Sequence, residues 1–209
     1  MRDLQGIIFD CDGVLFESRR ANLAYYNTVF ELLGEQLVVH PDDESRARLC
    51  HTACSRDVFH DLLGPEKVQH ALDCAAELDY KKFIPLMKPM PEMAEALDRL
   101  SCKYSLALAT NRGASAESIL HYFDLHRHFT AIVTSRDVPR PKPFPDMLHL
   151  ALKRMELPVE QVLYVGDSNL DRLAASEAHI LFAAYKADVP GDIDLESFSG
   201  LLEWIGTVS

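Results

Sequence analysis

The chain has 209 residues, of which 48% are hydrophobic and 25% are charged, and its formal net charge is −11. These proportions are typical of a globular protein with one sizeable core, or a core and a small second domain. The negative charge argues against nucleic acid as a partner, because phosphate backbones are bound by basic surfaces. It does not exclude a small anionic ligand, since a bound cation and a few local bases can reverse the sign inside one cleft.

The first predicted element is a buried strand near the N-terminus. Residues 6–18 read GIIFDCDGVLFES, so an apolar run leads directly into Asp10 and Asp12. Two carboxylates at the end of an apolar strand are costly to hold together unless positive charge lies between them. No signal peptide precedes this strand and no apolar run approaches the length of a membrane span, so we expect a cytoplasmic protein without a membrane partner.

A long helical segment follows this strand. From about Glu17 to Met87 the sequence contains no strand candidate. Apolar periodicity predicts helices over residues 18–35, 41–54, 55–64 and 65–87. Gly34 is expected to end the first helix and Pro41 to begin the second. We therefore predict an all-helical domain over residues 17–87, inserted into a domain formed by residues 1–16 and 88–209.

The rest of the chain alternates strands and helices. Short apolar segments rich in β-branched or aromatic residues predict strands at residues 104–110, 129–135, 161–167 and 179–185. Helical patterns flank them at residues 90–101, 115–125, 144–157 and 169–178. This alternation predicts an α/β fold, in which a parallel sheet carries helices on both faces.

Polar residues with related chemistry stand at the predicted strand ends. In open parallel sheets, ligands bind outside the carboxyl ends of the strands. That edge collects four carboxylates, one hydroxyl, one amide and one ammonium, from Asp10, Asp12, Asp167, Asp171, Thr110, Asn111 and Lys142. Clustered carboxylates can hold Mg²⁺, and one of them can act as a nucleophile. Lysine and threonine can stabilise the charge of a phosphoryl group, so the set suits phosphoryl transfer.

The order of these motifs resembles the haloacid dehalogenase superfamily, a group dominated by Mg²⁺-dependent phosphatases. A DxDGV stretch, a threonine after a strand, a Lys-Pro pair and a GDxxxD stretch follow one another, and the resemblance spans nearly the whole chain. The resemblance implies a Rossmann-like core. The helical insert is similar to the C1 cap of phosphoglycolate phosphatase-like and β-phosphoglucomutase-like members. The resemblance as a whole implies a phosphoric monoester hydrolase. Its substrate would be a small phosphorylated metabolite, either phosphoglycolate-like or a sugar phosphate. We expect the protein to be a monomer or weak dimer.

The resemblance also implies catalytic and metal-binding roles. Asp10 would be the nucleophile that forms an aspartyl-phosphate intermediate. Asp12 would protonate the leaving alcohol and then activate water, while its backbone carbonyl binds Mg²⁺. Asp10 and Asp167 would be direct Mg²⁺ ligands, and Asp171 would bind through water or orient the site. The cofactor expected from the resemblance is therefore Mg²⁺.

Phosphate binding and substrate choice are assigned to other residues. Members of the superfamily hold the phosphate with residues at the positions of Thr110, Asn111 and Lys142. In members with this cap, a loop at the position of residues 52–58 reaches into the active site. Ser55 is expected to cap the following helix. Arg56 is a candidate for binding a second anionic group of the substrate, since its fork suits bidentate contact.

Other activities on the same scaffold remain open. Asp12 disfavours dehalogenation, because members that attack carbon lack this residue. Asn22 stands where β-phosphoglucomutase-like mutases place a histidine, which leaves hydrolysis as the default over a sugar phosphomutase. A phosphonatase would use a cap lysine, for which Lys81 and Lys82 are available. A catalytically silent phosphate-binding protein would keep the fold, whereas a receiver domain would be shorter and lack the helical insert.

Two residues depart from the family pattern. Glu92 and His179 stand where the family more often has glycine, before a helix and before a strand respectively. Neither position belongs to the predicted chemistry.

Overall fold

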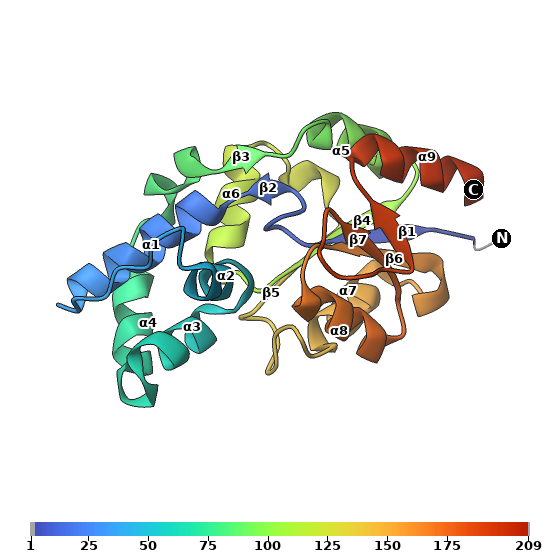
Figure 1. Ribbon diagram of the computed structural model, residues 1–209. Coiled ribbons are helices and arrows are strands. Elements are labelled where there is room, and N and C mark those ends of the chain that lie inside the picture. The colour runs from blue at the N-terminus through green and yellow to red at the C-terminus, as the bar shows by residue number, and fades with distance from the viewer. Residues whose placement is uncertain (1–2, 209) are drawn as a thin grey trace.

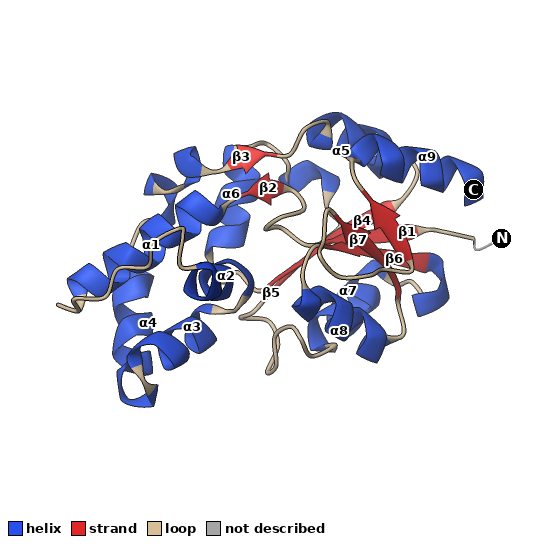
Figure 2. Cartoon of the chain, in the orientation of Figure 1, coloured by secondary structure: helices blue, strands red, loops and turns tan. Residues whose placement is uncertain are grey.

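The computed structural model describes residues 3–208, which form a six-stranded parallel sheet with an adjoining helical region (Figures 1 and 2). The strand order is β5-β4-β1-β6-β7-β8. The strands are β1 (Gly6–Phe9), β4 (Ser105–Thr110), β5 (Ala131–Thr134), β6 (Val162–Gly166), β7 (Leu181–Tyr185) and β8 (Ile193–Leu195). The predicted α/β class with a parallel sheet is therefore confirmed.

Strand β1 lies at the centre of the sheet and is buried on both faces. Gly6 pairs with Ser105 of β4 and with Val162 of β6, and the whole strand is buried. Successive side chains of a strand point to opposite faces. Ile7 therefore packs in the apolar cluster on one face, and Ile8 packs in the cluster on the other.

Helices cover both faces of the sheet (Figure 1). The cluster that contains Ile7 includes residues of α5 (Met93–Ser101), α6 (Ser115–Tyr122) and α9 (Phe198–Val208). The cluster that contains Ile8 includes residues of α7 (Asp146–Met155) and α8 (Asn169–Ala178). This two-sided cover explains why the central strands are continuous apolar runs rather than alternating patterns.

The chain between β2 (Phe16–Glu17) and β3 (Lys88–Pro89) is helical and forms the cap. It contains α1 (Arg19–Leu32), α2 (Glu44–Thr52), α3 (Ser55–Leu63) and α4 (Val68–Glu77), followed by short 3₁₀ turns. The four helices contribute to an apolar cluster of their own. Because Glu17 pairs with Lys88 in a two-stranded antiparallel sheet, both connections between cap and core lie side by side. The boundaries 1–16, 17–87 and 88–209 are our proposal for the division into domains.

Two predicted helices differ from the structure. Helix α2 begins at Glu44 rather than at Pro41, because the Asp43 carboxylate accepts a hydrogen bond from the backbone N–H of Arg46 and so caps the helix there. The predicted helix over residues 65–87 is interrupted after α4, and the 3₁₀ turns that follow include Pro85, which cannot donate a backbone hydrogen bond. Helix α9 and the short strands β2, β3 and β8 have no counterpart among the predicted elements.

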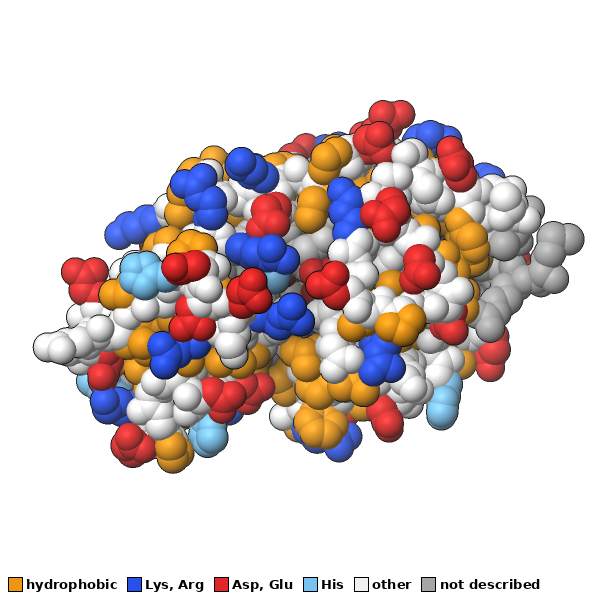
Figure 3. All heavy atoms as spheres, viewed as in Figure 1, with side chains coloured by type: hydrophobic (Ala, Val, Ile, Leu, Met, Phe, Trp, Pro, Cys, Tyr) orange, Lys and Arg blue, Asp and Glu red, His pale blue; other side chains and the backbone are white. Residues whose placement is uncertain are grey.

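The surface is mixed in character. On the face drawn in Figure 3, acidic, basic and apolar side chains of the described residues are interspersed. Within residues 3–208, no helix has the length and apolar character needed to cross a membrane.

Candidate active site

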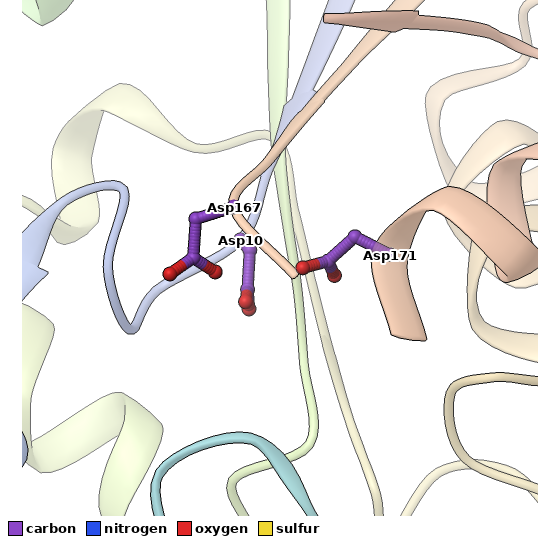
Figure 4. A group of neighbouring side chains, drawn as sticks. All are labelled: Asp10, Asp167 and Asp171. Atoms are coloured by element: carbon purple, nitrogen blue, oxygen red, sulfur yellow. The ribbon is translucent and has the colours of Figure 1, made fainter. Parts of the chain in front are cut away.

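Three carboxylates meet at the carboxyl ends of neighbouring strands. Asp10 follows β1, Asp167 follows β6, and Asp171 lies in the first turn of α8 (Figure 4). One oxygen of each lies within 4.8 Å of the others, and this is the only such group of three or more potential ligand side chains in the part of the chain that the structure describes. The pairing of β1 with β6 brings residues 157 positions apart in sequence to one edge.

A glycine makes this close approach possible. Gly13 has a φ of 78°, a conformation that favours glycine. A Cβ at this position would lie 1.8 Å from Asp167 Oδ2. The loop after Asp12 can therefore pass Asp167 only because residue 13 has no side chain.

Lys142 supplies positive charge to the cluster. Its ammonium Nζ lies 2.9 Å from Asp10 Oδ1 and 2.7 Å from Asp171 Oδ1, and it also donates to the Tyr164 hydroxyl. The side chain is 2% exposed. Burial lowers the pKa of Lys142, but the two carboxylates more than offset this and hold its pKa above the ordinary value. The lysine is therefore charged, and its ammonium group contacts both carboxylates.

One lysine does not balance three carboxylates. Burial raises the pKa of Asp10 to about 7, with Asp171 and Asp12 adding to the rise against the effect of Lys142. Burial, Asp171 and Asp10 likewise hold the pKa of Asp167 well above its ordinary value. None of the described residues donates a hydrogen bond to Asp167. The donor set is therefore all oxygen, carries excess negative charge, and fits a hard divalent cation.

Asp171 is held more firmly than the other two carboxylates. Its Oδ2 accepts from the backbone N–H of Ser168 at 3.0 Å and from the Ser168 hydroxyl at 2.5 Å. The Asp171 backbone N–H donates to the Ser168 hydroxyl oxygen at 3.3 Å, which completes a capping box at the start of α8. Its Oδ1 accepts from Lys142 and Tyr164. Burial opposes ionisation, yet Lys142 and these hydrogen bonds keep the pKa of Asp171 below its ordinary value. Asp171 thereby orients Lys142.

Asp12 is paired with Arg112, a residue that is not among the predicted site residues. Arg112 Nη2 donates to Asp12 Oδ1 at 2.6 Å, and the Ser18 hydroxyl donates to the same oxygen. Burial raises the pKa of Asp12, but Arg112 and His51 outweigh this and hold it below the ordinary value. Its position in the sequence could have indicated a role in the site, because Arg112 comes two residues after Thr110, the last residue of strand β4.

The two polar residues before Arg112 differ in their surroundings. Thr110 is 1% exposed, and its hydroxyl oxygen accepts a hydrogen bond from the backbone N–H of Arg112. The Asn111 side-chain amide donates to the backbone carbonyls of Thr52 and Lys142, and its oxygen accepts from the Lys142 N–H, each at 3.0 Å. Asn111 therefore ties the Lys142 loop to the C-terminus of α2.

A cavity of about 880 Å³ lies between the cap and the strand ends. Its wall includes most of the predicted site and the loop between α2 and α3: Asp10, Asp12, Thr110, Asn111, Lys142, Ser55 and Arg56. Asp10 belongs to both the cavity wall and the carboxylate cluster, and so connects the two. The phosphonatase candidates Lys81 and Lys82 are exposed and do not line the cavity.

The prediction that Ser55 caps helix α3 is wrong. Cys54 is the N-cap residue, because its extended backbone precedes the first helical residue, Ser55. The Ser55 hydroxyl lies 3.2 Å from the Tyr26 hydroxyl of α1 instead. Arg56 is exposed at the cavity, and none of the described residues forms an ion pair with it.

Comparisons with known proteins show the family of this chain. A family model described as haloacid dehalogenase-like hydrolase matches residues 7–185. The phosphoglycolate phosphatase of Escherichia coli strain K12 is 27% identical over 200 residues, which cover 84% of this chain and 79% of that protein.

Solved structures extend the similarity to the fold. A haloacid dehalogenase-superfamily hydrolase of subfamily IA, variant 1, from Geobacter sulfurreducens has 33% identity and a TM-score of 0.83, covering 96% of this chain and 99% of that one. CbbY from Rhodobacter sphaeroides, solved in complex with phosphate, has 22% identity and a TM-score of 0.81, covering 95% and 96%.

Proposed function

The chain belongs to the haloacid dehalogenase-like hydrolase family, whose model covers residues 7–185, and from this premise we propose that it is a Mg²⁺-dependent phosphatase that works through an aspartyl-phosphate. It is a phosphoric monoester hydrolase, and its substrate is a small phosphorylated metabolite. The observation that carries the proposal is the contact between Asp10 and Lys142, because it places a carboxylate nucleophile and a phosphate-binding cation on the wall of one cavity.

The carboxylate cluster supports Mg²⁺ as the cofactor. Asp10, Asp167 and Asp171, with the backbone carbonyl of Asp12, would hold the ion. Asp167 has no other described partner, and the cluster has more negative than positive charge. When bound, Mg²⁺ offsets the repulsion between the carboxylates and the incoming phosphate.

The nucleophile is oriented before substrate arrives. Asp10 Oδ1 accepts from the backbone N–H of Cys11 at 2.7 Å and lies 2.9 Å from Lys142 Nζ. No described residue donates a hydrogen bond to Oδ2, so we assign Oδ2 as the attacking atom. It forms a bond to phosphorus while the bond from phosphorus to the leaving oxygen breaks.

Proton transfer is assigned to Asp12. Because Asp12 is ionised in the free enzyme, it takes up a proton as substrate binds and gives that proton to the leaving alcohol in the first step. It then removes a proton from the water that attacks the aspartyl-phosphate and releases inorganic phosphate. Lys142 and the Thr110 hydroxyl stabilise the negative charge on the phosphoryl oxygens. Asn111 contributes by holding the Lys142 loop, since its side-chain amide is already bonded to that loop.

Substrate choice is assigned to the loop between α2 and α3. Arg56 lines the cavity from the cap side without a described ion-pair partner, which leaves its guanidinium free to bind an anionic group of the leaving moiety. Small doubly anionic substrates are therefore favoured, phosphoglycolate-like compounds among them. Ser55 supports the loop through its contact with Tyr26.

Phosphate release from a panel of phosphorylated metabolites tests the proposal. We expect turnover with Mg²⁺, none in excess chelator, and recovery when Mg²⁺ is restored. The variant Asp10→Asn should fold and lose activity by roughly a thousandfold or more, about 4 kcal/mol of transition-state stabilisation. Full turnover in excess chelator, or activity of Asp10→Asn within about tenfold of the wild type, would overturn it.

A further inference from the structure

A buried polar network surrounds Arg112. The Arg112 side chain is 6% exposed, and its two terminal nitrogens make three hydrogen bonds of 2.6 Å. Nη1 donates to the Tyr80 hydroxyl, and Nη2 donates to Asp12 Oδ1 and to Asn22 Oδ1. The guanidinium carbon also lies 5.1 Å from the centre of the Tyr80 ring. The planar guanidinium group is therefore held by three hydrogen-bond partners.

The network holds one oxygen of Asp12 and leaves the other free. Ser18, Asn22 and Arg112 all donate to Oδ1. None of the residues within 3–208 donates a hydrogen bond to Oδ2, and Asp12 lies on the cavity wall. A carboxylate fixed in this way has one oxygen available for proton transfer and little freedom to rotate away from the cavity.

The partners of Arg112 come from both parts of the molecule. Arg112 and Asp12 lie at the ends of the sheet strands, whereas Asn22 belongs to α1 and Tyr80 follows α4. Asn22 also lies 3.4 Å from His51 Nδ1 of α2. All of these bonds exist together only when the cap segment is packed against the strand ends.

The network is not arranged for maximum stability. Arg112 Nε is the one buried side-chain nitrogen or oxygen in the described part of the chain without a hydrogen-bond partner. Leaving such a group unpaired has a cost, and a buried ion pair often contributes little net stability compared with apolar packing. A functional reason for the arrangement is therefore required.

We propose that Arg112 is a positioning residue that aims Asp12 for proton transfer. This inference rests on the proposed function, in which Asp12 transfers protons. Arg112 fixes Oδ1, which directs Oδ2 into the cavity. Its bonds to Tyr80 and Asn22 make this orientation depend on the docked cap, so the proton-transfer group is set when the cavity is covered.

A double-mutant cycle tests the positioning role. Arg112→Met, Asp12→Asn and the double variant are compared by kcat/KM on an alkyl phosphate and on p-nitrophenyl phosphate, whose leaving group needs little protonation. Arg112→Met should lose about 10- to 100-fold on the alkyl phosphate, a part of the effect of a general acid, and much less on p-nitrophenyl phosphate. In the Asp12→Asn background, the same substitution should cause no further loss.

Two milder variants cover the case in which Arg112→Met does not fold. Tyr80→Phe removes only the hydroxyl that accepts from Nη1, and it should lose a few-fold with the same preference for the better leaving group. Arg112→Lys keeps the charge without the fork, and should give an intermediate loss. Arg127→Met is the matched control, because it breaks ion pairs with Asp98 and Asp124, none of these residues lines the cavity, and it should leave both kcat/KM values unchanged.

The outcomes separate this inference from the proposed function. Equal losses on both substrates, or an additional loss in the Asp12→Asn background, would overturn the positioning role and leave a structural one. If Arg112→Met is unfolded, an unchanged substrate preference in Tyr80→Phe would overturn it as well. Failure of the proposed function would instead appear as full activity in Asp12→Asn alone, or as absence of phosphate release by the wild type.

Discussion

At the scale of single residues, Gly13 controls how closely the loop after β1 approaches Asp167. We predict that Gly13→Ala lowers kcat by at least about a hundredfold, because displacement of a site residue by about 1 Å has this order of effect. The added Cβ would meet Asp167 Oδ2 at 1.8 Å, and the φ of 78° would be strained. Phosphate release across a Mg²⁺ titration measures the change.

The exposed turn glycine offers a matched control for this substitution. Gly34 also has a positive φ, of 72°, but no atom lies within 4 Å of a Cβ placed there. Gly34→Ala should therefore cost some stability and leave the Mg²⁺ dependence of turnover unchanged. A Gly13→Ala enzyme with normal kcat and normal Mg²⁺ dependence would contradict the placement of Asp167 beside this loop.

The carboxylates and the lysine of the site were predictable, whereas its arginine was not. Asp10, Asp167 and Lys142 follow apolar runs or a proline-rich turn, and the carboxyl ends of parallel strands always lie at one edge. Arg112 also stands at this edge, but the partners that bury it, Tyr80 and Asn22, are 32 and 90 positions away. Hydrogen bonds between residues so far apart in the sequence depend on how the cap packs against the sheet. No local sequence pattern encodes that packing.

At the scale of elements, the end of helix α8 contains a strained residue. His179 has a φ of 56° at the C-cap, where glycine has no steric penalty. The side chain is exposed. We predict that His179→Gly raises the free energy of unfolding by about 1 kcal/mol, the lower end of the cost of this conformation for other residues. Denaturant unfolding measures it.

The matched variant His179→Ala separates backbone strain from side-chain contacts. Alanine keeps the strained backbone and removes the imidazole, so its stability should stay near that of the wild type. If His179→Gly were no more stable than His179→Ala, backbone strain would not explain the departure from glycine at this position. Glu92, the other residue that stands where the family more often has glycine, also has a positive φ, of 64°. Its carboxylate accepts a hydrogen bond from the Ser199 N–H, so replacing it with glycine would remove this contact.

The loop between α2 and α3 carries the prediction on substrate choice. Arg56→Ala should reduce kcat/KM on a doubly anionic substrate by about 1.5–3 kcal/mol, the scale of a charged hydrogen bond. Hydrolysis of p-nitrophenyl phosphate should hardly change, because it offers no second anion. Steady-state kinetics on both substrates check this. Equal losses on the two, or no loss on either, would exclude Arg56 as the specificity residue.

Most elements of the fold were predictable, because their patterns are local. The apolar runs at residues 104–110 and 161–167 correspond to β4 and β6, and the helical periodicity of residues 169–178 gives α8. The three-residue strand β8 is too short to carry a pattern. It pairs with the edge of β7, where Ala183 lies opposite Ile193, so tertiary contacts define it.

At the scale of the whole molecule, the unbalanced charge of the site should limit stability when metal is removed. Saturating Mg²⁺ should therefore raise the melting temperature, with a contribution of about 2.7 kcal/mol at a hundredfold excess over its dissociation constant. Differential scanning calorimetry with Mg²⁺ and with chelator measures this. Asp167→Asn should melt at the same temperature in both conditions, and a variant that still responded fully to Mg²⁺ would exclude Asp167 as a ligand.

The excess negative charge of the site also predicts that the free energy of unfolding depends on pH when a chelator removes the metal. The pKa of Asp10 rises from 3.8 to about 7 in the folded protein, so the folded state binds this proton more tightly than the unfolded state. Stability from this group is therefore fully present below pH 3.8 and is lost as the pH rises through about 7. Relative to Asp10→Asn, the wild type should lose stability across this window by urea unfolding. A difference between the two proteins that did not change with pH would contradict this.

The proposed function depends on a covalent bond between Asp10 and phosphorus. The most direct measurement is the mass of the Asp10-containing peptide after acid quench of the enzyme during turnover with Mg²⁺. We predict that this peptide gains one phosphoryl group in the wild type and none in Asp10→Asn, which should also be inactive. Rapid turnover by Asp10→Asn, or a phosphoryl group found on another residue of the wild type, would exclude Asp10 as the nucleophile.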